Sequence, residues 1–199
     1  IISDEMYENL VYGDAKHVSI ASLNDEIYKR TITVSGVAKS YAMTGWRIGY
    51  VGASAEIAKL MSSVQSHSTS NPNSIAQKAT EEALLGPQDT VEIMRKEFDA
   101  RRKYMFSRVS TMPHVSCLEP QGAFYVFVDA TEACKMSYKG QKVETAAKLA
   151  KILIEDYNTA VIPCEDFAAD GHFRLSYAIS MEQIEKGLDR IESFLNVLE

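Results

Sequence analysis

The chain has 199 residues, 46% of them apolar and 24% charged, the usual balance of a globular protein with a sizeable core. Its net charge of −6, without any basic cluster, argues against binding to nucleic acid or to an anionic membrane surface. No apolar run approaches the ~18 residues of a membrane span, and the three widely separated cysteines suggest neither a zinc site nor a disulfide framework.

Short strand-like and helical segments alternate in the first part of the chain. Residues 1–3 have a strand pattern, 18–29 predict a loop and a short helix, and 31–34 and 48–52 are strand-like runs. Because the chain opens within a strand pattern and lacks an initiator Met, we expect the natural protein to begin well upstream.

Two helical patterns follow these strands. Apolar residues recur at helical spacing from Ser54, a suitable N-cap, to about residue 65. The polar run 66–72 predicts a loop. Ser74 and Gln77 then form a capping-box pattern for the next helix.

The rest of the chain predicts a second domain. Residues 89–111 carry the longest helical pattern, and we place a domain boundary inside it, between 1–96 and 97–199. Strands that alternate with helices indicate an α/β fold. The later strand candidates are 114–118, 123–129, 160–163 and 172–178, and the later helical patterns are 145–157 and, behind a capping box at Ser180 and Gln183, 184–198.

The most informative stretch, Ser35 to Tyr50, reads SGVAKSYAMTGWRIGY and has Lys39 near its centre. The lysine falls just past the predicted strand 31–34, where α/β sheets place their ligand sites. A loop lysine is most often a solvated charge. The alternative is an amine that forms a Schiff base with an aldehyde cofactor.

The run from Gly36 to Gly49 resembles the pyridoxal-phosphate attachment signature of class I aminotransferases of fold type I. The resemblance follows the whole chain in order but covers only the C-terminal half of such an enzyme. It implies the C-terminal part of the large, cofactor-binding domain at 1–96 and the small α/β domain at 97–199.

The resemblance also implies roles for three residues around the cofactor, pyridoxal 5'-phosphate. Lys39 would hold it as a Schiff base and act as the catalytic acid and base. In the motif Ser-Asp-Glu-x-Tyr, Asp4 would pair with the protonated pyridine nitrogen, since an opposite charge favours the protonated form, and Tyr7 would hydrogen-bond the ring 3-oxygen. Without the resemblance, Asp4 is a turn residue and Tyr7 a half-buried surface aromatic.

Three further residues have an implied role in anion binding. Arg47 would bind the cofactor phosphate, and Arg174, in the pattern Arg-Leu-Ser-Tyr-Ala, would clamp the substrate α-carboxylate bidentately. Ser35 is a candidate phosphate ligand, although the usual place of that hydroxyl is occupied here by Gly36. The residues alone also allow a surface charge at position 47 and a salt-bridge partner at 174.

Two loops need a separate interpretation. The resemblance suggests that 66–72 lies near a dimer interface and approaches the partner's cofactor phosphate, whereas the residues alone favour a plain loop. Pro163-Cys164 and Phe167-Ala168 stand where many relatives have Pro-Gly and Phe-Gly, so the shape of that loop is open.

The function implied is amino-group transfer in amino acid biosynthesis, between an L-amino acid, aspartate-like by family default, and a 2-oxo acid. The full-length form would be a cytoplasmic homodimer. As a partial enzyme, this chain would be weak or inactive alone, because the other half supplies the rest of the pocket. Two alternatives stay open: a pyridoxal-phosphate-dependent β-lyase on the same scaffold, and an aminotransferase-like sensor domain of a transcription regulator.

Overall fold

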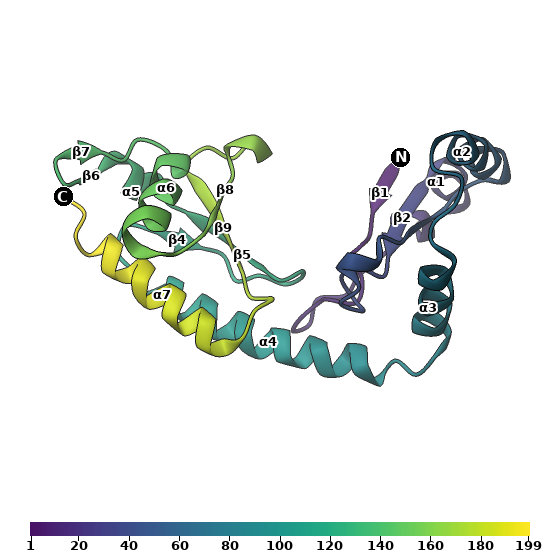
Figure 1. Ribbon diagram of the computed structural model, residues 1–199, viewed down its shortest axis with the longest axis horizontal. Helices are drawn as coiled ribbons and strands as arrows, with labels where there is room; N and C mark the ends of the chain where they lie inside the picture. Colours follow the sequence, from purple (N-terminus) through teal and green to yellow (C-terminus); the bar gives the residue numbers. More distant parts are fainter. The chain divides into compact units, whose positions relative to one another are not determined.

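The computed structural model describes residues 1–199 and divides into two compact units, Ile1–Arg95 and Lys96–Glu199 (Figure 1). Both units combine strands with helices, so the predicted α/β class is confirmed. Helix α4 (Asp89–Val109) contains the division between them. None of the helices has the length and apolar character needed to cross a bilayer.

The first unit is built on a three-stranded sheet in the order β1-β2-β3. Strands β1 (Ile2–Asp4) and β2 (Ile32–Gly36) run parallel, and β3 (Gly49–Gly52) is antiparallel to β2. The parallel pairing brings the carboxyl ends of β1 and β2 to the same edge of the sheet. The other elements of this unit are η1 (Ile20–Ser22), α1 (Asp25–Arg30), η2 (Thr44–Trp46), α2 (Ala55–Ser68), α3 (Ser74–Leu85) and the start of α4.

The second unit is built on a four-stranded antiparallel sheet in the order β4-β5-β9-β8. These strands are β4 (Ser116–Cys117), β5 (Tyr125–Asp129), β9 (His172–Ser176) and β8 (Ile162–Pro163). The other elements are α5 (Thr131–Lys135), the hairpin β6 (Ser137–Tyr138) and β7 (Gln141–Lys142), α6 (Ala146–Tyr157), η3 (Glu165–Phe167) and α7 (Met181–Leu195).

The core of the second unit follows from the alternation of β9. Phe173 and Leu175 are buried, while Arg174 between them lies on the opposite face, because successive side chains of a strand point to opposite sides. Helix α7 buries a stripe of apolar residues at helical spacing, which includes Ile184, Leu188 and Ile191. One face of the sheet is therefore core, and the other carries Arg174.

The N-caps predicted at Ser54 and Ser180 are confirmed, since each side chain accepts a hydrogen bond from the backbone three residues on. The capping box at Ser74 is wrong. Asn73 is the N-cap of α3, and its Oδ1 accepts from the Ala76 amide at 3.1 Å. The Gln77 side chain donates instead to the Pro72 carbonyl oxygen, at 2.8 Å.

The predicted loop 66–72 is partly helical, because α2 continues to Ser68. The hydroxyls of Ser66 and Ser68 donate to the carbonyl oxygens of Ser63 and Val64, at 2.8 and 2.9 Å. Serine is accommodated inside a helix when its hydroxyl bonds back to the preceding turn in this way. The polar composition alone did not reveal that arrangement.

Candidate active site

Asp4 and Lys39 stand at the carboxyl ends of two neighbouring parallel strands, the usual ligand edge of an α/β sheet. Asp4 ends β1, and Lys39 lies in the turn that follows β2. The half-buried Lys39 places its Nζ 5.9 Å from the centroid of the Tyr7 ring. The Asp4 carboxylate accepts a hydrogen bond from the Met6 amide at 3.1 Å and has no cationic partner.

The last residue of β2, just before the Lys39 turn, is packed closely against the residue that precedes β3. A Cβ added to Gly36 would lie 3.0 Å from the Ile48 carbonyl oxygen and 3.0 Å from the Met6 side chain. Because such contacts are tighter than side chains normally make, glycine at this position permits the close approach. The turn itself is closed by hydrogen bonds from the Tyr41 and Ala42 amides to earlier carbonyl oxygens, both at 3.3 Å.

Ser35, a predicted phosphate ligand, is buried, and its hydroxyl donates to Glu8 Oε1 at 3.2 Å. The hydroxyl is thus held by a carboxylate of the same unit. Anion binding there would require the hydroxyl to leave Glu8. Sequence reasoning assigned no role to Glu8.

Arg47 ends the η2 turn, two residues before β3, with a φ of +58°. Left-handed backbone is uncommon for a residue with a side chain, and such strain often accompanies a functional site. The exposed guanidinium donates only to the Thr44 carbonyl oxygen, at 2.8 Å, and has no carboxylate partner. Arg47 and Trp46 line a hollow of about 710 Å³.

The polar segment after α2 forms another wall of this hollow, where Thr69 and Asn71 to Asn73 lie. Arg47 is the cation among these lining residues, and the others offer uncharged side chains. A permanently charged guanidinium in uncharged polar surroundings is suited to a phosphate group. The segment therefore shares a hollow with Arg47 of its own chain.

A buried carboxylate that sequence reasoning passed over, Glu5, supports the strand end next to Asp4. It accepts hydrogen bonds from the hydroxyls of Ser3 and Ser19 at 3.0 Å each, from the Ile20 amide at 3.2 Å, and contacts His17 Nε2 at 3.0 Å. Burial alone would raise the pKa of Glu5, but these hydrogen bonds outweigh it and lower the pKa. The only signal in the sequence was an acid inside the Ser-Asp-Glu-x-Tyr motif.

Arg174 belongs to the second unit, on β9, and is held by aromatic rings. Its Cζ lies 4.2 Å from the centroid of the Tyr125 ring and 5.1 Å from that of Phe167. The Nε atom is buried without a hydrogen-bond partner, and the guanidinium forms no salt bridge. An unsatisfied buried donor is unfavourable, so this guanidinium is prepared to bind an anion. Sequence reasoning named Arg174 but missed both rings.

The functional groups of Lys39, Asp4 and Arg47 fit pyridoxal 5'-phosphate. The chain provides an amine at the end of β2, a carboxylate without a counter-ion in Asp4, and an exposed guanidinium without a carboxylate partner in Arg47. These groups match the aldehyde, the protonated ring nitrogen and the phosphate of that cofactor, in this order. Arg174 provides a further unpaired cation for a carboxylate.

Comparison with known proteins agrees with this chemistry. The family "Aminotransferase class I and II" matches residues 1–191. The chain is 44% identical over 195 residues to an aspartate aminotransferase of Geobacillus stearothermophilus, covering 98% of this chain and 49% of that protein. It is also 44% identical, over 197 residues, to a probable aspartate/prephenate aminotransferase of Aquifex aeolicus, covering 98% and 48%.

Among solved structures, the aspartate aminotransferase from Rhizobium meliloti matches all of this chain and 50% of its own, with a TM-score of 0.94 at 38% identity. The chain thus spans about half the length of the relatives it matches. The similarity covers the lysine turn, the strand with Arg174 and every element between them. The chain belongs to the class I and II aminotransferase family, as its lysine signature predicted.

Proposed function

We propose that the protein transfers an amino group between an L-amino acid and a 2-oxo acid, with pyridoxal 5'-phosphate held on Lys39. The observation that carries this proposal is the position of Lys39 after β2, beside Tyr7 and at the same sheet edge as Asp4. Aspartate is the proposed amino acid, because relatives at 44% identity are named aspartate aminotransferases. We further infer a cytoplasmic homodimer for the full-length form, as the family resemblance implies.

When bound, the cofactor supplies the electron sink for the substrate α-carbon. Asp4 would keep the ring nitrogen protonated, because its carboxylate has no competing cation in the structure. Tyr7 would donate its hydroxyl to the ring oxygen, and Arg47 would bind the phosphate. Ser35 could add a hydrogen bond to the phosphate only after releasing Glu8.

Two residues would act on the substrate itself. Arg174 would bind the α-carboxylate with two parallel hydrogen bonds, for which its unsatisfied Nε is available. The Lys39 amine would accept the proton of the substrate Cα as a general base and later return a proton as an acid. Lys39 lies in the turn directly after β2, and Arg174 lies on β9 against the Tyr125 ring.

We infer that this chain by itself is weak or inactive as a catalyst, because it spans about half the length of its relatives. A steady-state rate comparable to that of ordinary enzymes, ~10 s⁻¹, would contradict this inference. For the full-length protein, product analysis separates the proposal from a β-lyase. A keto acid that forms only with an amine acceptor indicates amino transfer, while pyruvate and ammonia without an acceptor indicate β-elimination.

The decisive test uses the chain itself. Pyridoxal phosphate is added, the protein is reduced with borohydride, and labelled lysines are mapped by mass spectrometry. We expect the label on Lys39, its loss in Lys39→Ala, and its retention in the control Lys59→Ala, which changes an exposed lysine of α2. Label spread over many lysines, with no loss in Lys39→Ala, would reject Lys39 as the cofactor lysine of this chain.

A further inference from the structure

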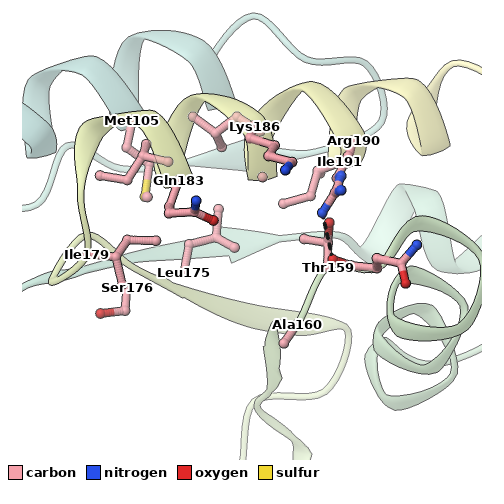
Figure 2. A pocket seen from close by; sticks show the side chains of 14 residues that line it. Met105, Thr159, Ala160, Leu175, Ser176, Ile179, Gln183, Lys186, Arg190 and Ile191 are labelled. Carbon is pink, nitrogen blue, oxygen red and sulfur yellow. Dashed lines mark hydrogen bonds between the residues drawn. The ribbon is translucent and has the colours of Figure 1, made fainter.

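We propose that the second unit carries a binding site for a small monocarboxylate with an apolar body, in a pocket between α7, β9 and the segment that follows α6 (Figure 2). The pocket has a volume of about 180 Å³. Leu175 lines it from the core face of β9, opposite the face that carries Arg174, and Ser176 contributes at the end of the strand. The site is therefore independent of the proposed amino transfer.

The floor of the pocket is apolar. Met105 from α4, Leu175 from β9 and Ile184, Leu188 and Ile191 from α7 supply it. All five are buried in the core of the unit, which makes the floor a rigid, preformed surface. Such a surface favours an alkyl body and offers little to a fully polar ligand.

The rim of the pocket is cationic. Lys186 and Arg190 are four residues apart on α7, so they share one face of the helix, and Figure 2 shows both on the side that faces Thr159. Neither forms a salt bridge, and Arg190 Nη1 donates to the Asn158 carbonyl oxygen at 2.8 Å. This bond anchors the guanidinium across the pocket and leaves its other N–H donors available.

The neighbouring acids do not neutralise this rim. Asp189 and Glu192 both bind Arg108, at 2.7 and 2.9 Å. Glu182 and Glu185 are exposed on α7 and pair with neither rim cation. A carboxylate ligand is thus the group that would complete the charge pairing at the pocket.

Gly187 gives an independent reason to regard this pocket as a site. It lies in the interior of α7 and lines the pocket. Glycine is a poor helix former, and it is usually kept in a helix for close packing. Here a Cβ would meet no heavy atom within 4 Å, so the packing does not require glycine. The absence of a side chain at Gly187 instead keeps the space of the pocket open.

The volume limits the size of the ligand. At about 180 Å³ the pocket is comparable to an apolar cavity of ~150 Å³ that binds benzene. That space admits an alkyl chain of about the size of pentanoate, with its carboxylate at the rim beside Lys186 and Arg190. Longer or branched bodies would have to displace Ile179, an exposed residue of the lining.

The test is a titration of the full ¹⁵N-labelled chain with pentanoate, followed by the amide signals of Thr159, Ile179 and Gly187. We expect saturable shifts with a Kd on the order of 1 mM, as suits so small a ligand. Pentylamine tests the charge and acetate tests the apolar body; neither should saturate these signals at the same concentrations. Absence of saturable shifts with pentanoate, or equal shifts with pentylamine, would overturn the proposal.

Variants tie the binding to the pocket. Gly187→Leu should abolish the saturable shifts, and Lys186→Gln should raise the Kd by roughly three- to tenfold, the loss of one charge-assisted contact. The matched control Lys142→Gln removes an exposed charge on β7, outside the pocket, and should leave the Kd unchanged. If Gly187→Leu fails to fold, Lys186→Gln decides. An unchanged Kd in Lys186→Gln would reject the site.

Discussion

The Arg174 guanidinium carbon lies 4.2 Å from the centroid of the Tyr125 ring, while the buried Nε of the same side chain has no hydrogen-bond partner. The ring face attracts the cation, and Phe167 does so from 5.1 Å. Neither ring can accept the Nε–H in the way a carboxylate does. The fold thus fixes this cation in position while leaving its hydrogen-bonding capacity for a ligand.

The first prediction is that Arg174→Met hardly changes the stability of the second unit. The substitution loses two cation–π contacts, each worth about 0.5–1 kcal/mol. It also removes a buried donor without a partner, and such a donor destabilises the folded state by about 1–3 kcal/mol. We expect the free energy of unfolding to change by less than about 1 kcal/mol. Urea unfolding followed by far-UV circular dichroism measures this change. A decrease of more than about 3 kcal/mol in the free energy of unfolding would show that the charge of Arg174 stabilises the fold.

Arg102 on α4 gives the opposite expectation. Its buried guanidinium donates to Asp99, Glu119 and the Pro120 carbonyl oxygen, each at 2.8 Å. Arg102→Met would remove these bonds, although Asp99 would keep Lys103 as a cationic partner at 2.7 Å. We therefore expect a loss of about 1.5–3 kcal/mol, the usual cost of losing a hydrogen bond between charged groups. The same urea experiment checks this value.

The control for Arg102 is Arg101→Met on the next position of α4. Arg101 has a distant pair with the exposed Glu97, at 3.8 Å, and its Cζ lies 5.9 Å from the centroid of the Phe98 ring. Exposed pairs of this kind contribute about 0–1 kcal/mol. Equal losses in the two variants would show that the length of the side chain, rather than the buried ion pairs, determines the stability.

The third prediction concerns pH and Glu5. Its folded-state pKa lies below the ordinary value of 4.5, because the hydrogen bonds from His17, Ser19, Ser3 and Ile20 outweigh the effect of burial. A lowered folded-state pKa adds stability that is fully present above pH 4.5 and is lost as the pH falls through the folded pKa. The first unit should therefore lose stability on acidification below about pH 4.5.

Trp46, the single tryptophan of the chain, reports unfolding of the first unit by fluorescence. In Glu5→Gln the slope of stability against pH below 4.5 should be smaller than in the wild type, although the variant is less stable at neutral pH. Glu26→Gln removes an exposed carboxylate of α1 and should keep the wild-type slope. Identical slopes in all three proteins would refute a stabilising role for ionised Glu5.

The long elements could be predicted because burial imposes a period on the sequence. Helix α7 is an example, since its apolar stripe and its Ser180 cap are both local patterns. The cap of α3 was misplaced by one residue because Asn and Ser are equally good N-caps, so the pattern does not distinguish Asn73 from Ser74. Helix α5 and the hairpin β6–β7 are too short to show a period.

The site was predictable where a long local motif carries it, as in the strand and turn around Lys39. The left-handed backbone of Arg47 was not, because it goes against the local preference of a residue with a Cβ. The rings around Arg174 could not be inferred either. Phe167 reaches the guanidinium from a loop whose shape depends on the backbone of Ala168, a contact without any sequence periodicity.

Ala168 leads to the last prediction, since its φ of +57° places an alanine in the left-handed region. That conformation costs a residue with a Cβ about 1–2 kcal/mol, and glycine removes the strain but adds freedom to the unfolded chain, worth about 0.4–1 kcal/mol. Ala168→Gly should therefore stabilise the second unit by about 0.5–1 kcal/mol. Urea unfolding measures the change.

Ala169→Gly is the matched control, because Ala169 is the next residue of the same loop and its φ is not positive. There glycine relieves no strain, so the added freedom of the unfolded chain should reduce stability by about 0.4–1 kcal/mol. The two substitutions are chemically identical and should have effects of opposite sign. If both destabilise the unit equally, the left-handed turn that brings Phe167 to Arg174 is not the conformation in solution.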